Sequence, residues 1–194
     1  MTLPVQPDHG RSKGEFANGW KVLLAAMLGV TCGASPIPFN LIGFTVEPLS
    51  AEFGWSRTEI ILPATIYGLI ASLMAPVFGW LSDRYGMRKV ALWSVFAFAV
   101  SLAAVALTPT AHTASTLYFY YGLWAVIGLV GIGSTPVTWS RAINLWFFRH
   151  RGLALGILLM GTSVAALFVP KLAVWAIARF GWRTMFALMA LLPL

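Results

Sequence analysis

Long apolar runs separated by short polar stretches dominate this sequence. Five runs are long enough to cross a membrane, because about 20 apolar residues span a hydrocarbon core ~30 Å thick. The runs cover residues 20–46, 58–81, 90–107, 117–141 and 152–178, and a sixth, at residues 182–194, reaches only part of the way across. The pattern predicts an all-α, polytopic membrane helix bundle with five full spans and an incomplete sixth. Residues 1–19 are polar and contain prolines and glycines, which predicts a disordered cytoplasmic tail.

The first run contains two prolines within residues 33–40. Proline lacks a backbone N–H and interrupts a helix. Broken backbone at membrane depth survives only against other protein or a water-filled cavity. We therefore expect a kinked first helix that lines a pathway, with Asn40 as a candidate polar contact there. The simpler alternative is an amide that is satisfied by a neighbouring helix.

Polar side chains in two other runs are further candidates for this pathway. Tyr67 lies in the second run, and Thr138 and Arg141 lie in the fourth. Ser134, Thr138 and Arg141 follow one another at i, i+4 and i+7, which places them on one face of a continuous helix. Arg141 could bind an anionic solute, or it could extend to the membrane interface and help to set topology.

The charge distribution agrees with a membrane protein. The chain is 59% hydrophobic and 10% charged, against about 45–50% apolar residues in soluble domains. The net charge of +7 comes from short basic clusters between the apolar runs, so it indicates topology and not a nucleic-acid partner. Nine cations fall on the side of the N-terminus: Arg11, Lys13, Lys21, Arg84, Arg88, Lys89, Arg141, Arg149 and Arg151. Four fall on the other side: Arg57, Lys171, Arg179 and Arg183. The positive-inside rule then predicts that the N-terminus faces the cytoplasm. We expect the protein to lie in the cell membrane.

Catalytic and metal-binding chemistry has few possible participants. Cys32 is the only cysteine, so neither an intrachain disulfide nor a cysteine metal cluster can form. The histidines, His9, His112 and His150, lie outside the apolar runs, and the interior of each run holds no acid, since Glu59 lies at the start of the second. The sequence therefore predicts no enzyme, no metal and no cofactor. A channel or a structural membrane subunit remains an alternative to a transporter.

A charged stretch at residues 79–89 separates the second and third runs. Its glycine and charged positions are Gly79, Asp83, Arg84, Gly86, Arg88 and Lys89. Gly79 would let a neighbouring helix approach closely, and Gly86 could adopt the positive φ that a tight turn needs. Asp83 could cap the start of the next helix. The basic residues favour a cytoplasmic turn.

This stretch, G-x-L-x-D-R-x-G-x-R-K, resembles the loop signature of the major facilitator superfamily, although Met87 stands where many members have arginine. Residues 52–57, 146–156 and 181–186 are similar to its monocarboxylate and oxalate/formate branch. The resemblance covers residues 20–194 and implies the N-terminal six-helix half of a twelve-helix transporter. Such a protein moves small organic anions, in many members with a proton, by rocking of its two halves. Asn40 stands where some members carry a lysine.

The resemblance also implies partners. They are the lipid bilayer, a small solute and a C-terminal six-helix half, against which residues 79–89 would act as a conformational-switch loop. Because the sixth run is short, we expect the 194-residue chain not to transport by itself. It would be a truncated or frame-shifted product, or a half that needs a partner half.

Overall fold

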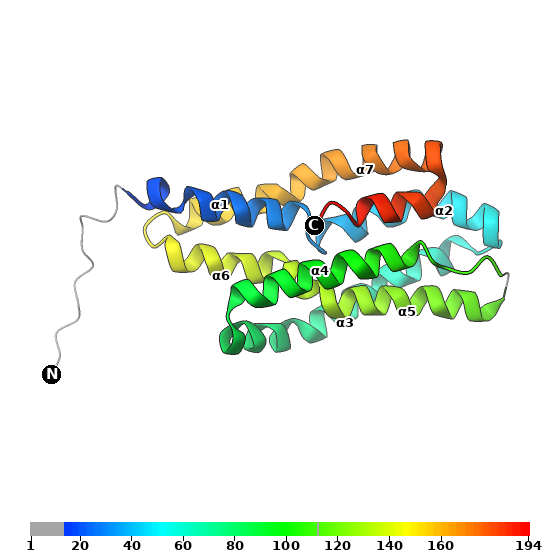
Figure 1. Cartoon of the computed structure of the whole chain (residues 1–194), viewed down its shortest axis with the longest axis horizontal. Helices are drawn as coiled ribbons and strands as arrows, with labels where there is room; N and C mark the ends of the chain where they lie inside the picture. Colours follow the sequence, from blue (N-terminus) through cyan, green and yellow to red (C-terminus); the bar gives the residue numbers. More distant parts are fainter. Residues whose placement is uncertain (1–13, 112) are drawn as a thin grey trace.

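The computed structural model of the protein describes residues 14–111 and 113–194. Most of these residues are helical, and no strand occurs among them. Five segments are long and apolar enough to cross a membrane: Gly19–Phe53, Arg57–Tyr85, Met87–Val105, Ala114–Trp146 and Arg151–Met189. They lie side by side along the long axis of the molecule (Figure 1). The predicted all-α membrane bundle is confirmed. Residues 1–13 of the predicted tail and His112 lie outside the described residues.

The first span consists of two helices, α1 (Glu15–Thr31) and α2 (Pro36–Phe53). The break between them confirms the predicted interruption. Pro36 is the first residue of α2, where its missing N–H costs nothing. Because α2 continues to Phe53, the outer loop expected from residue 47 onward is limited to residues 54–56. In addition, α1 starts at Glu15, so the last residues assigned to the tail are helical.

The next two helices form a hairpin around a single glycine. Helix α3 (Arg57–Tyr85) starts with a capping box in which Ser56 and Glu59 bond to each other's backbone N–H, as the S-x-x-E pattern predicts. Helix α4 (Met87–Val105) follows directly after Gly86, whose φ of 88° makes the reversal possible.

The fourth span is also broken, contrary to the continuous helix expected over residues 117–141. It consists of α5 (Ala114–Val130), the short 3-10 helix η2 (Gly131–Ser134) and α6 (Pro136–Trp146). The physical reason is Pro136, which lacks a backbone N–H and keeps Thr135 in an extended conformation. Ser134 therefore does not share one helical face with Thr138 and Arg141.

The last segment, α7 (Arg151–Met189), bends sharply at Gly181, where φ is 80°. The bend lies between the fifth and the sixth apolar runs of the sequence. Pro170 lies within α7 and does not end it. Gly152 and Gly156 form a G-x-x-x-G step, which could allow close helix contact, but no other group in the described part of the chain lies within 4 Å of a Cβ built at either glycine.

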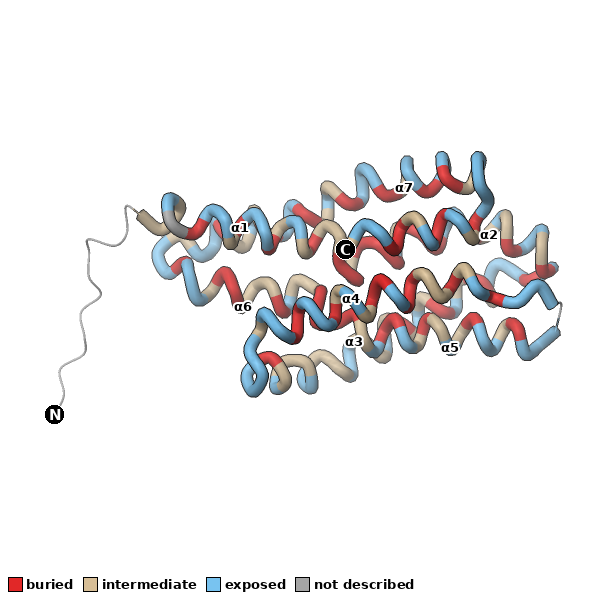
Figure 2. The backbone as a smooth tube through the Cα atoms, in the orientation of Figure 1, coloured by how far each residue is buried: buried red, intermediate tan, exposed pale blue. Residues whose placement is uncertain are grey.

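Buried side chains form two clusters. The larger cluster joins α2, α3, α4, α5 and α7, and the smaller joins α1, α6 and the start of α7. Figure 2 shows buried positions on the inward side of each helix and exposed positions on the outside. The exposed positions include many large apolar side chains, as expected for surfaces that face lipid. We call the end formed by the start of α1, the α3–α4 turn and the α6–α7 loop the basic end.

Candidate functional site

The two helix breaks meet inside the bundle, 100 residues apart in the sequence. The backbone N–H of Ala34 donates to Oγ of Ser134 over 3.0 Å, and this hydroxyl donates to the carbonyl of Gly131 over 2.7 Å. The hydroxyl of Tyr67 donates to the carbonyl of Ala34. Backbone groups that the breaks leave without helical partners are thereby paired, which the low-polarity interior requires. We call this contact the crossing.

Glycines bring the backbones at the crossing together. A Cβ added at Gly33 would lie 2.3 Å from the carbonyl oxygen of Ser134. A Cβ at Gly131 would lie 2.5 Å from Cβ of Ala34, and one at Gly133 would lie 2.6 Å from Cβ of Ser94. No larger residue fits at these positions without a shift of the neighbouring helix.

The crossing holds some of the predicted pathway residues within protein. Tyr67 is buried, and its ring packs edge-on against Phe39. Thr138 is also buried, in α6. Asn40 is half-buried, and its amide donates to the carbonyl of Pro36 in its own helix over 2.7 Å, and not to a neighbouring helix as the simpler alternative expected. A role of these residues in a solute pathway stays a prediction.

A hollow of about 580 Å³ lies at the end of the bundle opposite the basic end. It is lined by Gly43, Val46, Glu47, Ser50, Ala51 and Arg57. Asn40, Gly43, Glu47 and Ser50 lie on one face of α2, which the sequence had assigned to a loop beyond residue 46. Their spacing of three, four and three residues was the available signal. The hollow therefore adds Glu47 and Arg57 to the candidate residues.

Arg141 contacts the charged stretch at residues 79–89 and not the hollow. Its Nη1 lies 2.5 Å from Oδ1 of Asp83 and donates to the carbonyl of Gly79 over 3.1 Å. A Cβ at Gly79 would lie 3.3 Å from Nη2 of Arg141, so this glycine makes room for the guanidinium. The two partners are 41% and 71% exposed, which makes their ion pair a weak and solvated one.

The predicted capping role of Asp83, within residues 79–89, is wrong. Asp83 lies inside α3 and does not cap α4, whose start carries no side-chain hydrogen bond. Asp83 is exposed and faces Arg141 because α3 continues to Tyr85 before the turn. The cations Arg84, Arg88 and Lys89 are all exposed.

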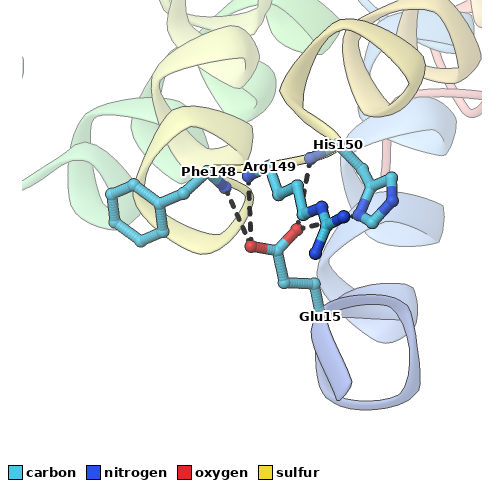
Figure 3. A network of polar contacts seen from close by, with 4 residues as sticks. All are labelled: Glu15, Phe148, Arg149 and His150. Carbon is cyan, nitrogen blue, oxygen red and sulfur yellow. Dashed lines mark hydrogen bonds and ion pairs between the residues drawn. The ribbon is translucent and has the colours of Figure 1, made fainter. Parts of the chain in front are cut away.

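A second contact at the basic end joins α1 to the α6–α7 loop. The carboxylate of Glu15 accepts hydrogen bonds from the backbone N–H groups of Phe148, Arg149 and His150, over 3.2 to 3.3 Å (Figure 3). Nδ1 of His150 lies 3.3 Å from the same carboxylate. These contacts, led by the Arg149 N–H, hold the pKa of Glu15 below its usual value. We call this contact the Glu15 clamp.

At the opposite end, three separate segments meet at Glu52. Its carboxylate accepts from Nε1 of Trp182 over 2.7 Å and from Nη1 of Arg183 over 2.6 Å. Nη2 of Arg183 donates to the carbonyl of Thr108 over 3.1 Å. The guanidinium also stacks on the Trp182 ring, 4.3 Å from its centroid. We call this contact the Glu52 clamp.

Metal-binding side chains do not gather in the described part of the chain. No group of three His, Cys, Asp or Glu residues occurs there that could hold an ion. Cys32 lies half-buried beside the first helix break and has no thiol partner.

Comparison with known proteins agrees with this architecture. The sequence model described as Major Facilitator Superfamily matches residues 19–194. Monocarboxylate transporter 6 of Homo sapiens is 31% identical over 91% of this chain and 33% of its own length. The cis,cis-muconate transport protein of Acinetobacter baylyi is 24% identical over 86% of the chain and 39% of its length. The hexuronate transporter of Escherichia coli is 25% identical over 86% of the chain and 37% of its length. The chain thus spans between a third and two fifths of these relatives.

Proposed function

Because this chain belongs to the Major Facilitator Superfamily, we propose that it forms a six-helix part of a secondary transporter for small organic anions. A second six-helix part would complete the transporter, since the relatives are more than twice as long. The two parts would rock about a central site and expose it to each side of the membrane in turn. We expect the 194-residue chain to need this partner for transport.

The observation that carries the proposal is the crossing of two interrupted helices inside the bundle. Transporters commonly place discontinuous helices next to their solute sites, because unwound backbone offers polar groups at membrane depth. Here the contact of Ala34 with Ser134 and the close approach at Gly33 support one rigid unit formed by the two broken spans. Such a unit could rotate without unfolding at its breaks.

Solute selection at the entrance to the central site would rest on the hollow at the far end. Arg57 offers a guanidinium that can bind a carboxylate in two-pronged fashion, and Glu47 offers an acid that can carry a proton. The relatives named for monocarboxylates, muconate and hexuronate support an organic anion as the solute. A coupled proton is part of the proposal.

The contact of Asp83 with Arg141 would be the switch element. It joins the end of α3 to α6, which is part of one of the two interrupted spans. A pair this exposed costs little to break, so a helix of the second part could compete for either partner. The charged stretch would then stabilise one of the two conformations.

We propose that the basic end faces the cytoplasm and that the protein lies in the cell membrane. The described cations support this orientation: Lys21, Arg84, Arg88, Lys89, Arg141, Arg149 and Arg151 lie at the basic end, against Arg57, Lys171, Arg179 and Arg183 towards the other end. This orientation is tested with two single-cysteine variants, Arg88→Cys and Arg179→Cys, each in a Cys32→Ser background. An impermeant maleimide then labels whichever site is reachable from outside the cell. Labelling of the Arg88 site from outside intact cells would contradict it.

Counterflow in proteoliposomes tests the function. Vesicles carrying the chain, alone and together with a second six-helix part, are loaded with unlabelled lactate, pyruvate or oxalate and given the labelled anion outside. Saturable exchange that Arg57→Gln weakens, with Lys171→Gln as the matched control, supports the proposal. Ion conductance without saturable exchange would favour a channel and contradict it.

A further inference from the structure

A groove between α3 and α4 begins at the basic end and is not used by the contacts described above. It encloses about 390 Å³ and is lined by residues that include Leu81, Tyr85, Lys89, Trp93, Ala97 and Val130. The hydroxyl of Ser94 in its wall donates to the carbonyl of Val130, so its proton is already engaged. Lys89 is the one charged side chain in the described lining. The groove is thus apolar along its length and cationic at one end.

The dimensions match the half of a bilayer nearest the basic end. Eight residues of α4 separate Lys89 from Ala97, a rise of about 12 Å. One leaflet of a hydrocarbon core ~30 Å thick has a depth of about 15 Å. Trp93 is 73% exposed and Tyr85 is 57% exposed, and such aromatic side chains prefer the level of lipid headgroups. The groove therefore extends from the membrane interface towards the middle of the core.

Positive charge surrounds the open end of the groove. Arg88 and Lys89 are exposed, and neither makes an ion pair or hydrogen bond with the residues that the structure describes. The guanidinium of Arg84 stacks over Trp80 and Tyr85, 5.3 and 5.8 Å from their ring centroids. The acid in the same stretch, Asp83, is already engaged by Arg141. The net field at this end attracts an anion.

We propose that this groove binds one anionic phospholipid, with its phosphate at Lys89 and an acyl chain along the apolar wall. A packed helix is about 10–12 Å across and does not enter a hollow of this size. The exposed aromatic rim would also keep a second helix at a distance, whereas close helix contacts use small residues. An acyl chain with a charged head fits both the shape and the charge.

Lipid binding to the purified chain in detergent tests the proposal. Retained lipid is measured by native mass spectrometry during titration with phosphatidylglycerol and with phosphatidylcholine of the same acyl chains. One lysine near a membrane surface changes affinity for anionic lipid about fivefold. We therefore expect Lys89→Gln to weaken phosphatidylglycerol about fivefold and to leave phosphatidylcholine unchanged. Ala97→Phe, which fills the apolar end, should weaken both lipids.

Lys171→Gln is the matched control, since Lys171 is an exposed lysine in another helix, α7. It should leave both lipids unaffected, and circular dichroism checks that each variant keeps its helix content. An equal loss in Lys89→Gln and Lys171→Gln would show a diffuse charge effect and overturn the proposal. Unchanged lipid binding in Ala97→Phe would also overturn it. So would a disulfide-linked dimer of a Trp93→Cys variant in a Cys32→Ser background, because a second copy of the chain would then cover the groove. None of these outcomes depends on which solute the protein moves.

Discussion

Gly33 offers the sharpest test of the crossing between the two broken helices. In Gly33→Ala the new methyl group would lie 2.3 Å from the backbone oxygen of Ser134 and 2.7 Å from that of Gly29. Ordinary contact begins near 3.4 Å, so the helices must separate by about 1 Å. Neither obstacle is a flexible side chain that could rotate away.

The expected cost follows from this overlap. Overpacking of a tight interior costs about 1–3 kcal/mol. Displacement of Ser134 also weakens its bond to Ala34, and hydrogen bonds between membrane helices contribute about 0.6 kcal/mol. The gain from replacing glycine by alanine is at most about 1 kcal/mol. We expect a net loss of about 2 kcal/mol, which lowers the melting temperature by about 4–8 °C for a chain of this size.

Gly43→Ala is the matched control. Gly43 lies in α2, and no other group lies within 4 Å of its added Cβ. Its replacement should leave the melting temperature unchanged or raise it by up to about 4 °C, because alanine favours the helix. Thermal unfolding in detergent, followed by tryptophan fluorescence, measures both variants. A Gly33→Ala protein that melts at or above the Gly43→Ala protein would refute the backbone contact.

Three further predictions concern the polar contacts. Asp83→Ala should slow counterflow in the completed transporter while solute affinity stays within about twofold. Its effect on stability should be below about 1 kcal/mol, because the pair with Arg141 is exposed. A loss of affinity at an unchanged exchange rate would count against a switch role. Glu52→Gln should lower the melting temperature by about 2–4 °C, since it weakens the charged hydrogen bonds of Glu52 to the buried Trp182 and to Arg183, which like Glu52 is about one third exposed. Arg179→Gln, which removes an exposed cation nearby, should have no effect. The pKa of Glu15 is lowered in the folded protein, so its clamp stabilises the fold above the unfolded pKa near 4.5 and this contribution is lost as the pH falls through the folded pKa. The free energy of unfolding in urea should therefore change less between pH 7 and pH 4 in Glu15→Gln than in the natural chain. An equal change in both proteins would exclude the clamp.

Local features of the sequence predicted most of the helical architecture. The lengths of the apolar runs determine how many spans the chain can form, because a bilayer has a fixed thickness. Pro36 marked the first break, and the Ser56 and Glu59 pair marked the start of α3. Gly86 occupies a turn with positive φ, as predicted, and Gly181 does the same between the fifth and sixth apolar runs. Each of these signals acts within a few residues.

Two local signals were read incorrectly. Pro136 was as clear a helix breaker as Pro36, yet the fourth run was taken as continuous, which placed Ser134 on the wrong face. The first span was expected to end at residue 46, where the apolar run ends, although α2 continues to Phe53. Glu47 was therefore assigned to a loop and not to the wall of the hollow.

The sequence by itself determined that this chain is a bundle of membrane helices with a broken first span and a charged turn. Only the tertiary structure decided which charges meet. Arg141 pairs with Asp83 across 58 residues, and Glu15 reaches His150 across 135. Helix formation depends on neighbours within one or two turns, so it can be read along the chain. Ion pairs depend on which helices lie side by side, and that is settled by packing of the whole bundle.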